Sequence, residues 1–154
     1  MFDLIGRLYS PVVAQGVVSV PPDAVYDAIT DPTTYTEWLV GAHDVRQVDS
    51  DFPAPGAEFD HSVGLGGPLT VGDSTETIEA VPDSRLSLLV HIRPFHARVD
   101  FELHLRADGG TDVRFSEVPV GAFRAITPAL RPMLFARNQS SLDRLRTYLE
   151  PDDT

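Results

Sequence analysis

The spacing of hydrophobic positions changes along the chain, and each change predicts a different kind of element. Valine-rich, loosely alternating sequence at Val12–Val20 is typical of a β-strand. The segment Pro22–Ile29 predicts a short helix, because proline is favoured at the first helical position. An aspartate followed by proline repeats that signal, so a second short helix is expected over Asp31–Trp38, ending at Gly41.

The middle of the chain is rich in strands. Segments with β-branched residues or alternating polarity lie at Val45–Val48, Ala57–Leu65, Leu69–Val81, Arg85–Ile92, His96–Arg106 and Thr111–Val118. Short turns rich in proline and glycine separate these segments. No turn is long enough to hold a crossover helix, so the strands should form an antiparallel meander.

Beyond Pro119 leucines recur every three or four residues up to Leu149, which is the period of an amphipathic helix. Pro132 lies within that pattern, so either the helix kinks there or the main helix begins near Arg131. The element order β-α-α-β6-α predicts an α+β fold. In it a strongly curved, seven-stranded antiparallel sheet wraps around the long C-terminal helix and leaves room for a pocket.

Length and composition narrow the possible chemistry. A chain of 154 residues suits one domain, assigned to residues 12–150, with an N-terminal arm at 1–11 and a tail at 151–154. There is no cysteine, and all 12 basic residues are arginine. A thiol nucleophile, a cysteine zinc site and a lysine Schiff base are therefore impossible. We expect no cofactor and no metal.

Charge and terminal sequence indicate the setting in which the protein works. The net charge of −11 argues against nucleic acid as a partner, because phosphate binding needs a basic face. The first residues lack a long apolar run, so neither a secretory signal nor a membrane span is predicted. We expect a cytoplasmic protein that is a monomer or a homodimer.

Several motifs together resemble a known superfamily. The run Val18–Pro32, followed by Tyr35 and Trp38, resembles the opening of the SRPBCC/START-like helix-grip superfamily. Further matches are Pro55–Phe59, Arg85–Leu88, Gly110–Val113 with Glu117, and Arg137–Leu142. Within the superfamily the sequence is most similar to the polyketide cyclase/dehydrase and lipid-transport branch. The resemblance implies the helix-grip fold, which hosts carriers, enzymes and receptors alike.

Two ionisable residues interrupt apolar faces of the predicted strands. His61 shares a face with Phe59 and Val63, where it could act as a general acid or base, or line the pocket with its ring hydrogen-bonded. Glu117 shares a face with Phe115. That carboxylate could pair with an arginine at 124 or 137, set the polarity of a ligand site, or transfer protons.

A primary amide interrupts the helical stripe in the same way. Asn138 falls between Leu134 and Leu142, and its amide could bond to an irregular backbone or contact a ligand. We expect the ligand site to be lined by Tyr35, Trp38, Phe59, His61, Val63, Phe101, Phe115, Glu117, Leu134 and Asn138.

Four further polar residues are placed by alternation. Glu76 and Glu79 should lie on opposite faces of their strand, so that one of them lines the pocket. His91 and His96 flank a turn and could sit opposite each other on adjacent strands. Both should point to solvent if the inward-facing residues are Leu86, Leu88, Val90 and Ile92. A metal site is not predicted there, because no carboxylate at fixed spacing completes it.

Three functions fit these observations. The first is binding of a small hydrophobic or aromatic ligand, lipid-like or polyketide-like, in an internal cavity of roughly 300–1,000 Å³, with the protein as a carrier. The second is a cofactor-independent polyketide cyclase or dehydratase, with His61 and Glu117 transferring protons and Asn138 orienting a carbonyl. The third is a stress-response or interaction module whose groove holds a peptide or a partner.

Overall fold

A computed structural model describes residues 6–66 and 69–150, and the side chains of those residues except 63–71. The predicted tail and the first five residues of the predicted N-terminal arm lie outside this range. In chain order the elements are β1 (Val12–Val18), α2 (Pro22–Ile29), the 3-10 turn η1 (Pro32–Thr34), α3 (Tyr35–Trp38), β2 (Ala42–Arg46), β3 (Glu58–Gly66), β4 (Leu69–Val81), β5 (Arg85–Ile92), β6 (Phe95–Leu105), β7 (Thr111–Pro119), the 3-10 segment η2 (Gly121–Ile126) and α4 (Thr127–Leu149).

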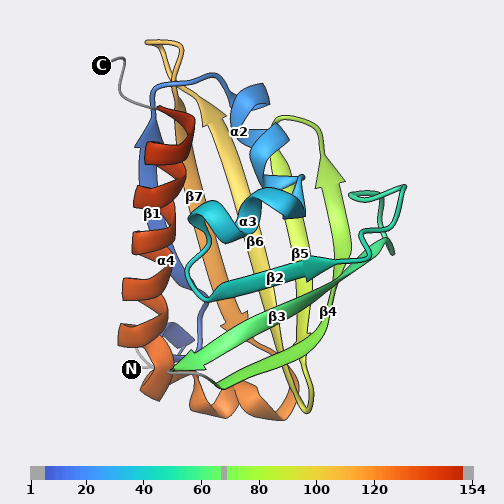
Figure 1. Ribbon diagram of the computed structural model, residues 1–154. Coiled ribbons are helices and arrows are strands. Elements are labelled where there is room, and N and C mark those ends of the chain that lie inside the picture. The colour runs from blue at the N-terminus through green and yellow to red at the C-terminus, as the bar shows by residue number, and fades with distance from the viewer. Residues whose placement is uncertain (1–5, 67–68, 151–154) are drawn as a thin grey trace.

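The strands form one curved antiparallel sheet. Its seven strands lie in the order β1-β7-β6-β5-β4-β3-β2, so every strand pairs with its neighbour in the chain except β1, which closes onto β7. Figure 1 shows α4 running along the edge formed by β1 and β7, with α2 and α3 over the same side of the sheet. The predicted α+β helix-grip architecture is confirmed.

The short helices begin and end where the sequence predicts. Proline occupies the first turn of α2, and the carboxylate of Asp31 caps η1 by accepting a hydrogen bond from the Thr33 N–H at 3.1 Å. Gly41 follows α3 with a φ of 92°, a left-handed conformation that glycine adopts without strain. The turn at Gly41 ends α3 and changes the chain direction, so that the chain continues directly into β2.

Two elements differ from the prediction. The strand expected at Val45–Val48 begins earlier, at Ala42, because the chain pairs with β3 as soon as it leaves the Gly41 turn. Pro132 lies inside α4, which starts at Thr127 rather than near Arg131. Proline is tolerated here because only one helical hydrogen bond is lost, the one that a backbone N–H at position 132 would donate to the carbonyl of residue 128.

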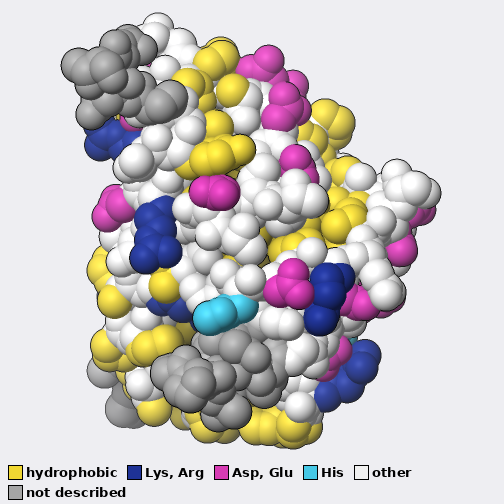
Figure 2. All heavy atoms as spheres, in the orientation of Figure 1, with side chains coloured by type: hydrophobic (Ala, Val, Ile, Leu, Met, Phe, Trp, Pro, Cys, Tyr) yellow, Lys and Arg dark blue, Asp and Glu magenta, His cyan; other side chains and the backbone are white. Residues whose placement is uncertain are grey.

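The surface reflects the acidic composition. On the face shown in Figure 2, arginine side chains lie singly among acidic and apolar ones, in keeping with the net charge of −11. None of the helices in the described ranges is long and apolar enough to cross a lipid bilayer.

Candidate functional site

Five aromatic residues predicted to line the ligand site form one cluster on the inner face of the sheet. Phe101 and Phe115 stack with ring centroids 4.5 Å apart, and Trp38 meets Phe101 edge-on at 6.0 Å. Tyr35 contacts the ring of Phe59 at 5.7 Å. All five side chains are buried, with exposed fractions of 3% or less. Helix α3 is thereby anchored to the sheet, and the aromatic rings form much of the core.

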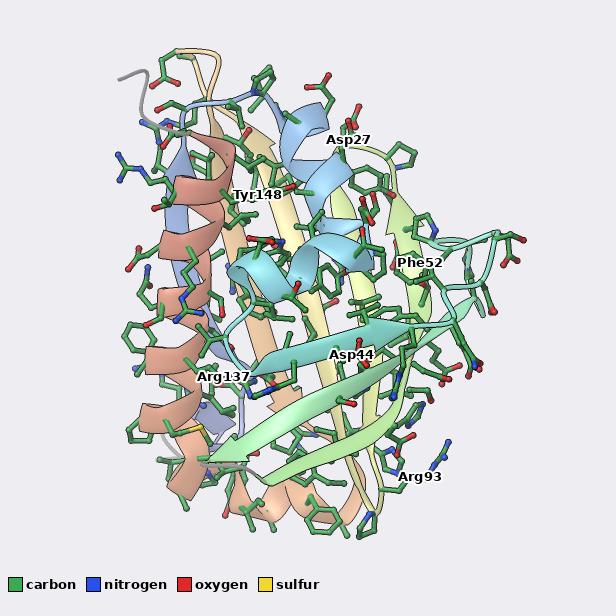
Figure 3. The ribbon with its side chains drawn as sticks, viewed as in Figure 1. Asp27, Asp44, Phe52, Arg93, Arg137 and Tyr148 are labelled. Carbon is green, nitrogen blue, oxygen red and sulfur yellow. The ribbon has the colours of Figure 1, made fainter. Side chains whose placement is uncertain are left out.

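A polar cluster lies further along the same face, between β7 and α4. The Glu117 carboxylate is buried, and its Oε1 accepts hydrogen bonds from Arg137 Nη2 at 2.5 Å and from Asn138 Nδ2 at 3.0 Å. Figure 3 shows Arg137 extending from α4 toward the sheet. Of the two arginines proposed as partners of Glu117, the one on α4 makes the ion pair.

Asn138 is fully buried, so its amide must be satisfied inside the protein. Its amide donates a hydrogen bond to the Glu117 side chain. The sequence suggests a bond to an irregular backbone or a contact with a ligand, and the observed partner is neither of these. Leu134 lies one turn earlier on α4 and is also buried. Together these residues place an ion pair and an amide on a face that is otherwise aliphatic and aromatic.

His61 occupies the inner face of β3, close to the Phe59 ring at 6.1 Å. Only 6% of the residue is exposed, and Nε2 has no hydrogen-bond partner. Burial lowers the pKa of His61 below its usual value, although a hydrogen bond to the Ser74 backbone and the charges of Asp73 and Asp60 oppose the shift. The ring is therefore neutral at pH 7 and offers one uncommitted nitrogen.

This pKa shift predicts a pH dependence of stability. A histidine whose pKa is lower when folded than when unfolded stabilises the protein fully above pH 6.5 and loses that contribution as the pH falls through its folded pKa. We expect the difference in unfolding free energy between wild type and His61→Phe to be constant above pH 7 and to become less favourable to wild type as the pH falls below 6.5. Urea unfolding at each pH measures this difference, and parallel curves over the whole range would refute the shift.

The two predicted catalytic residues do not contact each other. In the described part of the chain, no hydrogen bond or ion pair joins His61 to Glu117. The carboxylate near His61 is instead Asp73, which lies directly opposite it on β4 and on the same face of the sheet. Sequence reasoning missed Asp73, although it alternates with the buried Thr75 and Thr77. The side chain of Val63, the remaining predicted lining residue, lies outside the described residues.

Glu76 and Glu79 are both on the outer, convex face, which corrects the prediction that they lie on opposite faces. A β-bulge between Thr77 and Glu79 restarts the alternation. Glu76 Oε1 lies 3.1 Å from His91 Nε2, and Glu79 Oε2 lies 3.8 Å from Arg85 Nε. Neither carboxylate therefore faces the inside of the sheet.

His91 and His96 sit directly opposite each other on adjacent strands, as expected, but they are half-buried rather than pointing freely to solvent. Their Nδ1 atoms lie 2.6 Å apart across the β5–β6 pair, and both residues are half-buried. Their rings form one cross-strand contact because the two residues are directly opposite in the register. Among the described residues, no group of three or more side chains is arranged to hold a metal ion.

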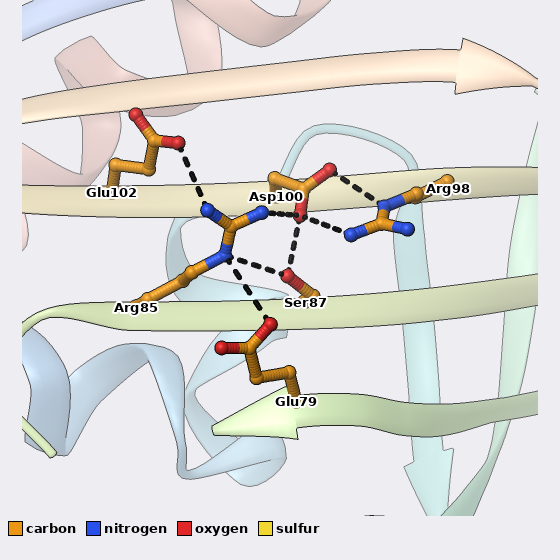
Figure 4. A network of polar contacts seen from close by, with 6 residues as sticks. All are labelled: Glu79, Arg85, Ser87, Arg98, Asp100 and Glu102. Carbon is orange, nitrogen blue, oxygen red and sulfur yellow. Dashed lines mark hydrogen bonds and ion pairs between the residues drawn. The ribbon is translucent and has the colours of Figure 1, made fainter. Parts of the chain in front are cut away.

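A polar network covers the middle of the convex face (Figure 4). Asp100 accepts hydrogen bonds from the fully buried Ser87 hydroxyl, from Arg85 Nη2 at 3.2 Å and from Arg98 Nε at 3.0 Å. Burial raises the pKa of the Asp100 carboxyl, but the hydrogen bonds from Arg98 and Ser87 and the two arginine charges outweigh it, so that the pKa is lowered. This network joins β5 to β6 on the side away from the inner face.

Replacing Asp100 with alanine should lower the free energy of unfolding by about 2 kcal/mol, since a buried hydroxyl and two arginines lose their acceptor. The matched control is Asp112→Ala, which removes an exposed partner of Arg106 and should cost less than about 0.5 kcal/mol. Chemical denaturation of both variants measures the contrast. Equal losses in the two variants would mean that the network is no stronger than a surface ion pair.

Two open grooves lie elsewhere on the described surface. One is beside Arg106, Asp108 and Asp112 near the β6–β7 turn, and the other involves Glu37 and Tyr148, between α3 and α4. Both are lined in part by charged side chains. The polar residues of the inner face, His61, Glu117 and Asn138, line neither of these two grooves.

Comparison with solved structures identifies chains of the same fold. The chain is similar to protein CV1439 from Chromobacterium violaceum, at 21% identity and a TM-score of 0.72, covering 92% of this chain and 98% of that one. It is similar to SA2116 from Staphylococcus aureus, titled a protein of unknown function, at 12% identity and a TM-score of 0.72, covering 91% and 93%. It is similar to TTHA0849 from Thermus thermophilus, at 15% identity and a TM-score of 0.71, covering 91% and 97%.

At these identities the structural likenesses show the fold alone. Among proteins of curated function, none matches the chain. The model of one protein family, described as polyketide cyclase/dehydrase and lipid transport, matches residues 12–150. That match spans the whole sheet, both short helices and α4, and it confirms the resemblance that the sequence motifs indicate. The chain therefore belongs to the polyketide cyclase/dehydrase and lipid transport family and has the helix-grip fold.

Proposed function

We propose that the protein binds a small hydrophobic or aromatic molecule between α4 and the concave face of the sheet. The observation that carries this proposal is His61, a buried side chain on an apolar face with an unpartnered ring nitrogen. Buried polar groups in proteins are almost always hydrogen-bonded, so an unpartnered one is a natural contact for a ligand. The family description, which includes lipid transport, supports the same class of ligand.

The residues around His61 support an apolar ligand body. The Phe59 ring lies next to His61 and meets the Phe52 ring edge-on, with the two phenyl centroids 5.3 Å apart. Elsewhere between the sheet and α4, Val99 on β6 and Leu134 on α4 are buried aliphatic residues. Ligand sites commonly combine such apolar walls with a few polar groups that fix orientation.

A thermal-shift and native mass-spectrometry screen tests the proposal, with dodecanoic acid, 1-dodecanol, 2-naphthol and quercetin as probes. A probe present at about 100 times its dissociation constant should add about 2.7 kcal/mol to the stability of the protein. At least one probe should form a one-to-one complex and raise the melting temperature in proportion to its affinity. If no probe binds, the proposal is wrong.

A matched pair of variants locates the binding. Val99→Trp fills buried space on the inner face, whereas Leu105→Trp adds the same side chain at a position that is 69% exposed. Circular dichroism should show that both variants fold, since overpacking costs about 1–3 kcal/mol. In the Val99→Trp variant the probe should no longer raise the melting temperature, whereas in Leu105→Trp it should raise it as in wild type.

A second candidate function is proton transfer in a cyclisation or dehydration reaction. The neutral, unpartnered ring of His61 favours it, because such a ring can accept a proton from a bound substrate. Glu117, with its two hydrogen bonds, would hold the negative charge that orients Arg137 and Asn138. With a poly-β-ketone thioester that wild type cyclises, His61→Ala should slow turnover about a hundredfold or more. Unchanged turnover in both His61→Ala and Glu117→Gln would exclude this candidate.

A further inference from the structure

The solvent-exposed side of α4 is apolar over the first half of the helix. From the last residue of η2 to the middle of α4, every exposed residue is apolar. Met133 and Phe135 are about half exposed, at 52% and 50%. A helix that packs on a core from one side normally turns polar residues to water on the other. We call this departure the apolar end of α4, and its residues are Ile126, Ala129, Pro132, Met133, Phe135 and Ala136.

The second half of the same helix has the polar face expected of a helix on a core surface. Between residues 137 and 147 the exposed side chains are Ser140, Asp143, Arg144, Arg146 and Thr147. Figure 2 shows hydrophobic side chains gathered over the start of α4 and the neighbouring end of the molecule, while the acidic side chains on this face lie elsewhere. An exposed apolar patch of this kind marks a surface that contacts another molecule.

The chain around the apolar end of α4 is basic. Residues 118–142 contain three arginines and none of the 23 acidic residues of the protein. Arg137 is paired with Glu117, but Arg124 is exposed and forms no ion pair among the described residues. Arg131 is held beside the start of α4, where its Nη1 donates to the Ser10 carbonyl at 2.6 Å. On a protein with a net charge of −11, this end therefore suits a negatively charged partner.

A second copy of this chain fits the apolar end poorly. Two copies meeting through it would bring the same arginines together, and residues 118–142 supply no acid to pair with them. A stable dimer also uses about 20–30 residues from each partner, many more than this end provides. A membrane surface needs far less area, because a few apolar side chains can enter the acyl region while nearby arginines keep their charged groups at the lipid phosphates.

We propose that the apolar end of α4 docks the protein on a lipid bilayer that contains anionic phospholipid. The side chains of Ile126, Met133 and Phe135 contact acyl chains, and Arg124 contacts lipid phosphates. The helix lies along the membrane surface and does not cross it. This docking does not depend on the proposed ligand site, because the apolar end faces solvent and the ligand site faces the sheet.

Vesicle flotation with the full chain tests the proposal. Wild type should float with vesicles of equal parts phosphatidylcholine and phosphatidylglycerol. A double variant with Met133→Gln and Phe135→Gln should bind at least about tenfold more weakly, because the amides lose the gain from burying apolar surface. The matched control is Tyr148→Gln, which replaces an aromatic residue that is 42% exposed near the other end of α4. It should bind as tightly as wild type.

A charge reversal tests the contribution of Arg124. Arg124→Glu should weaken binding to the mixed vesicles about tenfold, since an attractive charge becomes a repulsive one. It should weaken binding to vesicles of phosphatidylcholine alone much less. Arg144→Glu changes an exposed arginine in the polar half of the same helix and should leave binding to both kinds of vesicle unchanged.

A fluorescence measurement locates the contact. Lipids with brominated acyl chains should quench the new tryptophan in Phe135→Trp and leave that of Tyr148→Trp unquenched, with the fully buried Trp38 as a common background. Absence of flotation, equal binding of the double variant and wild type, or equal quenching of the two tryptophans would overturn the proposal. If wild type stayed off vesicles and sedimented as a dimer while the double variant sedimented as a monomer, the surface would belong to a second copy and the proposal would be wrong.

Discussion

Replacing Glu117 with leucine is expected to lower the free energy of unfolding by about 3 kcal/mol. The carboxylate is 7% exposed and accepts hydrogen bonds from Arg137 and Asn138, so its loss leaves a guanidinium without its counter-ion and a fully buried amide without its acceptor. Leucine fills most of the space but cannot accept either bond. Urea denaturation at pH 7 measures the change.

Two further variants separate this effect from general loss of charge. Glu117→Gln keeps an acceptor and the shape of the side chain, so it should lose less than Glu117→Leu. Glu102→Leu removes a half-exposed carboxylate that pairs with Arg85 at 3.3 Å on the convex face, and it should cost less than about 1 kcal/mol. If Glu117→Leu proved as stable as wild type, the inner cluster would not be a structural element of the site.

Replacing Trp38 with alanine is expected to have a larger effect still, about 4 kcal/mol. The indole is fully buried, meets the rings of Tyr35 and Phe101 edge-on, and donates from Nε1 to Thr34 Oγ1 at 3.0 Å. Its removal leaves a cavity at the point where α3 is held against the sheet. For a domain of this size the melting temperature should fall by roughly 10 °C.

Calorimetry of the variant and of two controls tests that expectation. Trp38→Phe retains an aromatic ring and should lose clearly less stability than Trp38→Ala. Tyr148→Ala truncates an aromatic residue that is 42% exposed, and it should change the unfolding free energy by no more than about 0.5 kcal/mol. A Trp38→Ala loss as small as that of Tyr148→Ala would mean that α3 is not anchored through this ring.

Much of the fold follows from local signals. The proline at the start of α2 and the Asp31 cap of η1 are short-range features, and turns rich in proline or glycine separate most of the strands. Apolar residues recur about every second position in a half-buried strand and about every 3.6 positions in a helix. This difference distinguishes the strands of the sheet from α4. Because the strands are joined by short turns, sequence order alone also predicts most of the pairing.

The site was harder to predict because it depends on register and on long-range packing. The bulge after Thr77 moves Glu79 to the same face as Glu76, and a bulge leaves no local trace in the alternation. The choice between two arginines for Glu117 depends on how α4 rests against β7, which no local pattern encodes. Asp73 faces inward because of its pairing with His61, across a strand whose alternation contains Gly72.

The most direct test of ligand binding inside the grip is an NMR measurement of intermolecular contacts with 2-naphthol. Methyl-labelled protein should show nuclear Overhauser effects from the bound compound to Val99 and Leu134, which are buried on β6 and α4. It should show none to Val17 and Leu105, which are 43% and 69% exposed. Contacts confined to the exposed methyl groups, or no contacts at a saturating concentration of 2-naphthol, would contradict binding at the inner face.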